Sequence, residues 1–198
     1  MELKEALDIV SYKIGLRFGE TALGDELFLD EKIHEAIRDK AAGSEQEIDL
    51  KIYMQATHIV SAERSRLFKV KNENFLTENA TNSDIKTTES GLQYKIIKAA
   101  ESPSNSNKPK PTDSVTVHYT GKLTCGTIFD SSVERGEPST FAVEKVIQGW
   151  SEAIQLMQVG EKFEFYIPQS LGYSKRGMGS DIPPYATLIF EVELLAIS

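Results

Sequence analysis

The chain has 198 residues, of which 40% are hydrophobic and 26% charged, and its formal net charge is −8. This composition is typical of a globular protein with one large or two smaller domains, and the acidic surplus argues against a general nucleic-acid binder, because phosphate groups attract surplus cations. The single cysteine, Cys125, excludes an intrachain disulfide, and no Cys/His spacing is typical of a zinc site, so we expect neither a metal ion nor a cofactor.

The N-terminus begins MELKEALDIV, which is an acidic helical pattern without the basic and apolar regions of a signal peptide. No apolar run approaches the roughly 18 residues that a membrane helix needs, so we expect no membrane partner. These features favour the cytoplasm, or the periplasm if a leader has been removed from the chain.

Two helices are expected before the long segment described below. The apolar face of the first consists of Leu3, Ala6, Leu7, Val10, Ile14 and Phe18. The second runs from Asp30, a good N-cap, to Gly43, a good C-terminal stop. Gly15 and Gly19 lie four positions apart, and each glycine costs about 1 kcal/mol relative to alanine in a helix interior. We infer that another backbone approaches closely there; a locally weak, bent helix is the alternative.

A long segment from Asp49 to Asn79 contains neither Gly nor Pro and predicts one helix of roughly 45 Å, at 1.5 Å per residue. Its near-heptad positions are Ile52, Ala56, Ile59, Glu63, Leu67, Val70 and Asn74. The chain before it supplies too little apolar surface to cover a helix of that length. We therefore expect an intertwined homodimer through residues 1–88, with Gly15 and Gly19 at a helix crossing. A solvated linker helix on a monomer is the alternative.

From Leu92 onward the apolar residues tend to alternate, which predicts strands. The expected strands are 92–96, 115–119, 122–129 after a turn at Gly121, 141–143, 162–167 and 187–197. A polar, proline-bearing surface loop is expected at 100–112, and one short helix at 149–157. An antiparallel sheet against a single short helix is an α+β fold. We therefore predict a helical domain at 1–88 and a β-rich domain at 89–198.

Conventional catalytic groups are scarce in this sequence. His34 and His58 fall on expected helices and His118 lies in an expected strand, so we interpret all three as structural. Cys125 lies in an expected turn without a neighbouring histidine to lower the pKa of its thiol. The glycine-rich stretch RGMGSD lacks the spacing and the lysine-serine ending of a phosphate-binding loop. No good candidate for nucleophilic catalysis remains.

Aromatic residues instead gather near the ends of the expected elements. Tyr119 and Phe129 lie near strand ends, Trp150 begins the short helix, and Tyr173 precedes a glycine-rich loop. Such residues form either the core of the domain or the lining of a concave apolar pocket with a few polar groups.

At these residues the sequence closely resembles the FKBP-type peptidyl-prolyl cis-trans isomerases. The matching runs are VTVHYTGKL (115–123), GTIFDSS (126–132), VIQGWSEAIQLMQVGEK (146–162) and IPPYATLIFEVELL (182–195). The resemblance covers about residues 90–198. In the N-terminal region, SYKIGLRFG (11–19) and the long helix resemble the dimerisation domain of the bacterial FKBP22-like and macrophage infectivity potentiator-like branch.

The resemblance implies a half-barrel of antiparallel strands around the short helix, which binds a prolyl ring above Trp150. The catalytic residues that it implies are Tyr119, Phe129, Asp130, Trp150, Tyr173 and Phe190. The substrate- or inhibitor-binding residues that it implies, with the backbone N–H of Ile147 among them, are Phe141, Val146, Ile147, Met178 and Ile182. The implied partners are X-Pro peptides, unfolded proteins and macrolides of the FK506 and rapamycin type.

Three positions depart from the commonest family pattern. Ser139 stands in place of an aromatic wall residue, Ser174 in place of glycine, and Asp181 in place of an apolar residue. These changes bear on substrate preference and macrolide affinity. We expect an isomerase that rotates X-Pro bonds without breaking any bond, with chaperone activity as a dimer. The alternative is a holdase or adaptor that binds unfolded chains without significant turnover.

Overall fold

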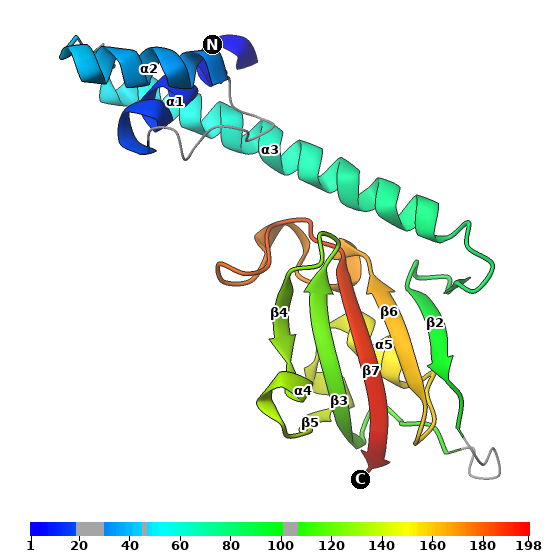
Figure 1. Cartoon of the computed structure of the whole chain (residues 1–198). Helices are drawn as coiled ribbons and strands as arrows, with labels where there is room; N and C mark the ends of the chain where they lie inside the picture. The colour runs from blue at the N-terminus through cyan, green and yellow to red at the C-terminus, as the bar shows by residue number, and fades with distance from the viewer. Residues whose placement is uncertain (19–29, 45–46, 101–106) are drawn as a thin grey trace. The chain divides into compact units, whose positions relative to one another are not determined.

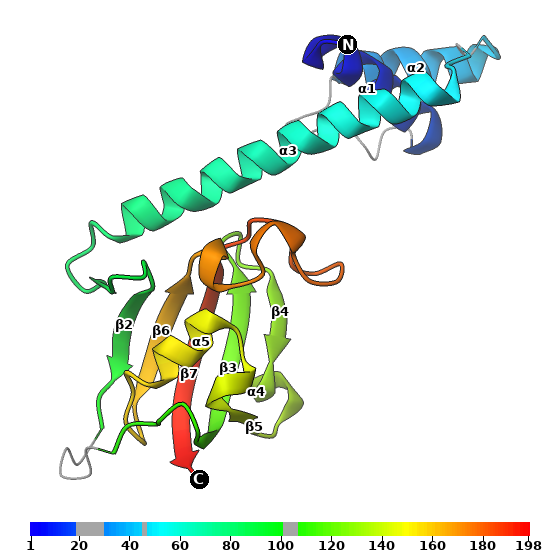
Figure 2. The ribbon, with the colours of Figure 1, turned by 180° about the vertical axis from the view of Figure 1, so that it is seen from behind.

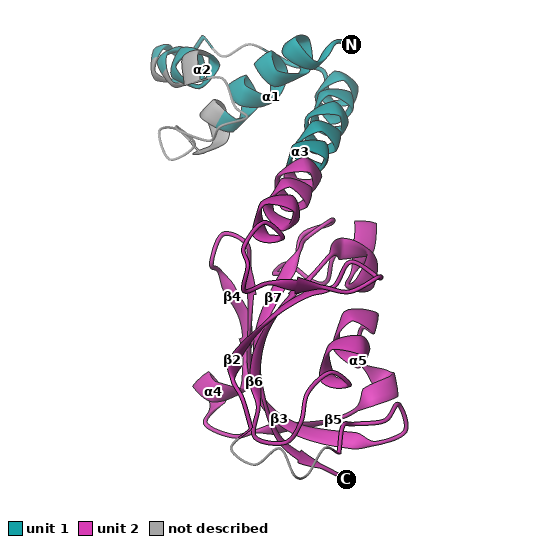
Figure 3. Ribbon diagram, turned by 90° about the vertical axis from the view of Figure 1, so that its right-hand side faces the viewer, with its two compact units in different colours: residues 1–67 teal, residues 68–198 magenta. Residues whose placement is uncertain are grey.

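The chain divides into two compact units (Figure 3), and the division falls inside its longest described helix, which Figure 1 labels α3. The computed structural model describes residues 1–18, 30–44, 47–100 and 107–198. We call residues 1–67 the helical unit and residues 68–198 the sheet unit.

The helical unit contains the helices that the apolar spacing predicts. Helix α1 is Leu3–Phe18, α2 is Asp30–Ala42 and α3 is Leu50–Asn79. Asp49 caps α3, because its carboxylate Oδ1 accepts the backbone N–H groups of Lys51 and Ile52 at 2.8 and 3.2 Å. No helix in the described ranges is long and apolar enough to cross a membrane.

Small side chains form the buried contact between the first and third helices. The buried cluster between α1 and α3 consists of Ala6, Val10, Ala56 and Val60. A hydrogen bond of 2.8 Å from the Tyr12 hydroxyl to the Asp39 carboxylate joins α1 to α2. Gly15 lies in α1, while Gly19 lies outside the described residues. Among the near-heptad positions of α3, Ala56 is buried and Ile52 and Leu67 are exposed.

The last part of α3 belongs to the sheet unit, for a physical reason that lies in its side chains. Phe68 packs against the buried core of that unit, and the ring of Phe75 lies 6.1 Å from that of Tyr166. Asn72 is 2% exposed and accepts a hydrogen bond from the backbone of Thr187. The compact units therefore divide at residues 67 and 68, earlier in the chain than the expected domain boundary after residue 88.

The sheet unit is built on one antiparallel sheet. Its strands are β1 (Lys86–Thr87), β2 (Gln93–Lys98), β3 (Ser114–Leu123), β4 (Ile128–Ser131), β5 (Ser139–Ala142), β6 (Lys162–Ile167) and β7 (Leu188–Ile197). Their order is β1-β2-β6-β7-β3-β4, and β5 also pairs with β3. Burial alternates along β3, which is the period of a strand with one face toward a core.

The predicted turn at Gly121 is wrong, because β3 continues through this residue to Leu123. Gly121 pairs with Asp130 of β4 and with Phe190 of β7. A Cβ atom built on Gly121 would lie 2.6 Å from the ring of Phe190 and 2.7 Å from that of Phe129. Glycine is therefore needed here to leave room for two aromatic rings, and not to reverse the chain.

The short helices also differ from the prediction of a single one. Helix α5 (Gln148–Ile154) ends before Met157, because the N–H groups of Leu156 and Met157 bond three residues back, in tighter 3₁₀ turns. The structure adds β1, a four-residue helix α4 (Ser132–Arg135) and the 3₁₀ turns η2 (Val143–Lys145), η3 (Gln169–Leu171) and η4 (Ser174–Arg176).

Helix α5 covers the concave face of the sheet, as seen from behind in Figure 2. Its close approach depends on Gly149, where a Cβ atom would lie 2.3 Å from Cγ2 of Ile167 in β6. Between helix and sheet lies the core, whose fully buried members include Leu92, Phe165 and Leu194. The open space that remains beside α5 is the candidate site.

Candidate active site

A cavity of about 680 Å³ opens between α5, the concave face of the sheet and the connection from β6 to β7. Its lining residues are Tyr119, Phe129, Asp130, Phe141, Lys145, Val146, Ile147, Trp150, Tyr173, Met178, Gly179, Asp181, Ile182 and Phe190. All eleven side chains that the sequence assigned to catalysis or ligand binding are among them. The fold therefore brings together residues spread over some seventy positions of sequence.

Trp150 forms the floor of an aromatic box. The indole is 5% exposed, and the rings of Tyr119, Phe141 and Phe190 stand edge-on to it. Their centroids lie 5.2, 5.5 and 5.2 Å from that of Trp150, with interplanar angles of 89°, 79° and 86°. Phe129 extends the wall by standing edge-on to Phe190 at 5.4 Å. Edge-to-face contacts fix ring orientation, so the box is a preformed apolar surface.

The floor also contains an unsatisfied donor. The indole Nε1 of Trp150 is buried and has no hydrogen-bond partner among the described residues. Its neighbours at this depth are aromatic rings, which offer only weak acceptors. The floor of the cavity therefore carries one N–H donor, that of Trp150, which no polar side chain accepts in the described residues.

The polar rim is a network around Asp130. The Tyr119 hydroxyl and the Arg135 guanidinium both donate to the Asp130 carboxylate. Arg135 also donates to the hydroxyls of Tyr119 at 3.1 Å and Ser139 at 3.3 Å. Its guanidinium carbon lies 5.6 Å from the Tyr119 ring centroid. Two donors thus hold the Asp130 carboxylate, which fixes its orientation.

The network shifts the pKa values of its members. Burial by itself raises the pKa of the Asp130 carboxyl. The hydrogen bonds from Tyr119 and Arg135 lower it by more, so the pKa of Asp130 lies below its ordinary value. Burial first, and the hydrogen bond to Asp130 second, raise the pKa of Tyr119. Asp130 is therefore a carboxylate and Tyr119 a neutral phenol near pH 7.

Arg135 is a residue that reasoning from the sequence missed. It ends α4, whose N-cap Ser131 accepts the N–H of Glu134 at 3.2 Å. The sequence signal that could have revealed it was the Ser-Ser pair after Asp130. Serine is a good N-cap, and one helical turn from there ends at Arg135. Ser139, noted for its departure from the family pattern, is here a partner of this arginine.

Tyr173 brings a second phenol to the rim, and the backbone around it is strained. Burial first, and the charge of Asp130 second, raise the pKa of its hydroxyl, which stays neutral near pH 7. Ser174 and Tyr185 both have positive φ angles, of 51° and 66°, and the N–H of Tyr185 donates to the carbonyl of Ser174 at 2.8 Å. Positive φ at residues other than glycine costs of order 1–3 kcal/mol, so other contacts must hold this segment.

Two backbone segments complete the opening. Val146 and Ile147 lead into α5, and the N–H of Ile147 makes no hydrogen bond with the described residues. Met178 and Ile182 pair across a tight turn, with Met178 53% exposed and Ile182 4% exposed.

Lys145 and Asp181 are charged residues of the lining, and only Asp181 was noted from the sequence.

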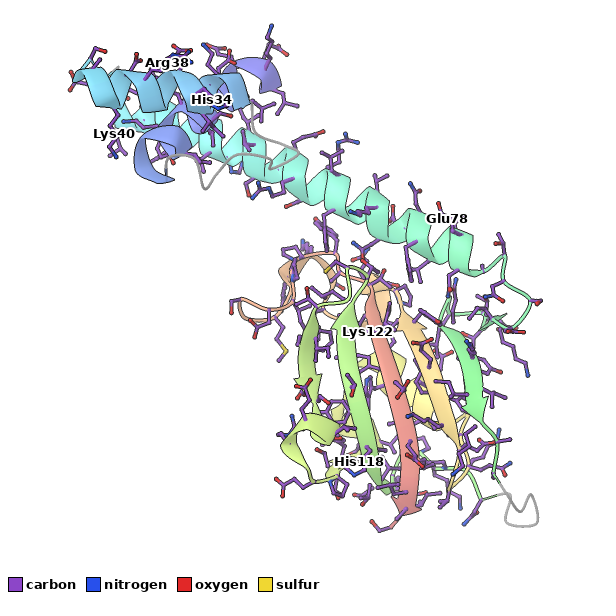
Figure 4. All side chains as sticks on the ribbon, viewed as in Figure 1. His34, Arg38, Lys40, Glu78, His118 and Lys122 are labelled. Atoms are coloured by element: carbon purple, nitrogen blue, oxygen red, sulfur yellow. The ribbon has the colours of Figure 1, made fainter. Side chains whose placement is uncertain are left out.

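Other reactive side chains lie away from this cavity. Figure 4 labels His34 on α2 and His118 on β3, and His118 bonds the Ser132 hydroxyl at 3.1 Å. His58 is exposed on α3. Cys125 is exposed in the turn between β3 and β4, where a hydrogen bond with Thr127 lowers the pKa of its thiol. Within the described ranges, no three His, Cys, Asp or Glu side chains gather as metal ligands would.

The lining can therefore hold an apolar ring between aromatic walls and offer hydrogen bonds at the rim. The donors near the opening include the Tyr173 hydroxyl, the Ile147 N–H and the Lys145 ammonium. The carboxylate of the rim network accepts hydrogen bonds from Tyr119 and Arg135. Such a site suits preferential binding of one shape of a ligand more than attack on one of its bonds.

Comparison with known proteins assigns both parts of the chain. The family described as "FKBP-type peptidyl-prolyl cis-trans isomerase" matches residues 105–195. The family described as "Domain amino terminal to FKBP-type peptidyl-prolyl isomerase" matches residues 7–96.

Similar proteins cover from about two thirds to nearly the whole of the chain. The "FKBP-type 22 kDa peptidyl-prolyl cis-trans isomerase" of Escherichia coli is 43% identical over 196 residues, which are 94% of this chain and 93% of that protein. The "Outer membrane protein MIP" of Legionella longbeachae is 45% identical over 129 residues, 65% of this chain and 54% of that protein. The crystal structure of FkpA from Escherichia coli superposes with a TM-score of 0.66 at 29% identity, covering 95% of this chain and 94% of that one.

Proposed function

The chain belongs to the FKBP-type peptidyl-prolyl cis-trans isomerases, and we propose that the cavity above Trp150 is where it binds the prolyl ring of its substrates. The observation that carries this proposal is the aromatic box, in which three rings stand edge-on to the indole. An apolar ring fits such walls, and the residues on either side of proline remain at the rim.

The reaction asks for rotation and not for bond breaking. Resonance keeps the X-Pro amide planar with a barrier of about 18–20 kcal/mol, and uncatalysed isomerisation takes roughly 10–100 s. An apolar site disfavours the charge-separated planar amide relative to the twisted one. Because the twisted form is then bound more tightly than either planar isomer, the barrier falls without a nucleophile or a base.

The rim residues are assigned roles that follow from their positions. The Ile147 N–H and the neutral Tyr173 hydroxyl are donors for substrate carbonyl groups. Asp130, held by Tyr119 and Arg135, keeps a negative charge beside the opening. Lys145 on the lining adds a positive charge, so the flanking residues of the substrate meet both signs.

The test of the site uses one wall residue and a neighbouring control. Phe129→Ala removes a ring that lines the cavity, and we expect kcat/KM for a proline-containing test peptide to fall at least about tenfold. Ile128→Ala, at the 46% exposed neighbour, controls for a change in β4 and keeps normal activity. Full activity in Phe129→Ala would move the site elsewhere.

We propose also that the protein is a homodimer through residues 1–88. Large apolar side chains remain in water on the part of α3 that lies in the helical unit, including Leu50 at 70%, Met54 at 64% and Leu67 at 45% exposure. A second copy covers such a surface without a new partner. Sedimentation of the full chain is expected to give a dimer, and of a chain beginning at residue 68 a monomer; a monomeric full chain would contradict the proposal.

We also propose chaperone action on unfolded proteins. A dimer carries two cavities, and a client bound at one cavity meets the second at high local concentration. The competing function is a holdase without significant turnover. A chain beginning at residue 68 separates them: the isomerase reading expects unchanged turnover of short peptides and slower catalysis of protein refolding. Loss of peptide turnover in that chain would favour the holdase.

FK506-type macrolides are proposed as ligands of the same cavity. Their affinity is expected to be reduced, because Ser139 supplies a hydroxyl bonded to Arg135 where an aromatic wall would stand. Competition between FK506 and a test peptide measures it. The cytoplasm, or the periplasm if a leader has been removed, stays a prediction that cell fractionation decides.

A further inference from the structure

Residues 68–79 of α3, here called the docked helix end, are fastened to the sheet unit by buried amide side chains. Figure 3 draws them in the colour of that unit. Gln93 of β2, 4% exposed, donates to the Leu76 carbonyl at 2.8 Å and accepts from the Asn79 amide at 2.8 Å. Asn72, 2% exposed, makes the second fastening. Two buried polar side chains in one contact call for an explanation beyond apolar packing.

The partners of Asn72 give that explanation. Its Nδ2 donates to the Phe68 carbonyl at 2.8 Å, and its Oδ1 accepts the backbone N–H of Thr187 at 2.8 Å. The Thr124 hydroxyl lies 3.4 Å from the same oxygen. Thr187 directly precedes β7, so its N–H has no ladder partner and depends on the asparagine.

Thr187 is the last residue of the segment 168–187 that connects β6 to β7, here called the pocket loop. This loop carries Tyr173, Met178, Asp181 and Ile182 of the cavity lining. A second contact joins it to the helix, because the Lys69 ammonium lies 5.9 Å above the ring of Tyr185.

The contacts run on from the helix to the cavity. Tyr185, at a positive φ, donates its N–H to the carbonyl of Ser174, which is also at a positive φ. Ser174 follows Tyr173 directly, so the strained base of the pocket loop lies between the helix contacts and a lining residue. Strained backbone persists only where its surroundings hold it, and Asn72 and Lys69 are among those surroundings.

We propose that Asn72 is a positioning residue for isomerisation: by accepting the Thr187 N–H it holds the pocket loop, and with it Tyr173 and Ile182, where they line the cavity. The proposal rests on the cavity being the isomerase site. Failure of that assignment is seen in an active Phe129→Ala variant, whereas failure of this proposal is seen in the comparison below.

The decisive experiment compares two fastenings of one helix in the full chain. Asn72→Ala removes the fastening that touches the pocket loop, and Gln93→Ala removes the one that does not. Asn74→Ala, at an exposed asparagine two positions along the same helix, is the matched control. The measurements are kcat/KM for a proline-containing peptide, the thermal midpoint, and the backbone amide NMR signals of residues 168–187.

We expect Asn72→Ala to lower kcat/KM about fivefold, since the loop then occupies its binding position for only a fraction of the time. The amide signals of Thr187 and Tyr173 are expected to shift or broaden with it. Gln93→Ala lowers the thermal midpoint but keeps kcat/KM within about twofold, and Asn74→Ala changes neither.

Equal losses of kcat/KM in Asn72→Ala and Gln93→Ala, or no loss in either, would overturn the proposal, because the amides would then only stabilise the fold. Asn72→Asp keeps an acceptor for the Thr187 N–H and loses the donor to Phe68. It is expected to be less stable yet closer to full activity than Asn72→Ala. If Asn72→Ala does not fold, Asn72→Ser takes its place, because serine stays polar but lacks the amide group that accepts the Thr187 N–H. The expected result and the result that would overturn the proposal are the same.

Discussion

The two units of this protein bury apolar surface in different ways. In the described residues, the sheet unit has a buried cluster of nineteen residues that includes Trp150, Phe163 and Phe165. The buried cluster between α1 and α3 in the helical unit consists of two alanines and two valines. Since burial contributes about 25 cal/mol per Å² of apolar surface, the first cluster stabilises its unit far more than the second.

The difference fits the separate roles proposed for the two units. The sheet unit closes its core by itself and leaves one concave opening, the cavity, for a ligand. The helical unit leaves large apolar side chains of α3 in water, as Leu50 and Met54 show. Its surplus of apolar surface suits a partner copy, and the five predictions below test this contrast between a closed and an open region.

The largest expected effect is the loss of a core ring in the closed unit. Phe165 of β6 is 1% exposed, and Phe165→Ala removes most of its buried surface. We expect the free energy of unfolding to fall by about 3–5 kcal/mol, measured by urea denaturation followed by near-ultraviolet circular dichroism. A loss below about 1 kcal/mol would mean that the core of the sheet unit is not closed.

A change on the open unit is expected to act on assembly and not on turnover. Replacing both Ile52 and Leu67, 44% and 45% exposed, by serine removes apolar surface that a second copy would cover. The dissociation constant of the proposed dimer is expected to rise at least about tenfold, since burying such a side chain contributes roughly 1.5–3 kcal/mol. Sedimentation measures it, with Lys51→Ser as the control, and peptide turnover stays unchanged. An unaltered dimer would place the interface on another face.

Ion pairs in the two units are expected to differ in importance. Asp130→Asn removes the charge that Tyr119 and Arg135 stabilise, and a several-fold loss of kcat/KM, roughly fivefold, is expected. Glu63, 20% exposed, accepts two hydrogen bonds from Arg66 on α3, and Glu63→Gln is expected to leave activity unchanged and to lower stability only slightly.

The pH dependence follows from the lowered pKa of Asp130. A carboxyl with a lower pKa in the folded than in the unfolded protein stabilises the fold fully above its unfolded pKa of about 3.9. That contribution is lost as pH falls through the folded pKa. The thermal midpoints of wild type and Asp130→Asn should thus differ at pH 7 and converge below about pH 4; a constant difference would contradict the shift.

The smallest expected effect concerns the exposed thiol of the closed unit. A hydrogen bond with Thr127 lowers the pKa of Cys125, so alkylation by iodoacetamide should reach half its maximal rate below the ordinary thiol pKa of about 8.5. Urea should restore the ordinary value, which makes this thiol a reporter of the sheet unit alone. Thr127→Val is expected to raise the midpoint with no change in turnover, and an unchanged profile would remove the proposed cause.

Local patterns predicted much of this structure, because they depend on neighbouring residues. Alternation of apolar residues located β3, β6 and β7, helical spacing located α1 and α3, and spacing with good caps located α2. Gly121 was misplaced because a glycine that leaves room for two distant rings looks, in sequence, like a glycine that turns the chain.

Residues whose partners lie far along the chain escaped this reasoning. Asn72 was not identified, since its partner Thr187 is 115 positions away and an asparagine within a helix looks like a solvated one. Arg135 was missed because its three partners lie on β3, β4 and β5, which only the folded sheet brings to one rim.

The sequence by itself determined the division into helices and strands, the family and most of the pocket lining, because these depend on local periodicity and on runs of matching residues. The tertiary structure alone decided which charged groups pair at the rim and how the last turns of α3 contact the pocket loop. Those features depend on hydrogen bonds between distant segments, whose directions are fixed only when the backbone has folded.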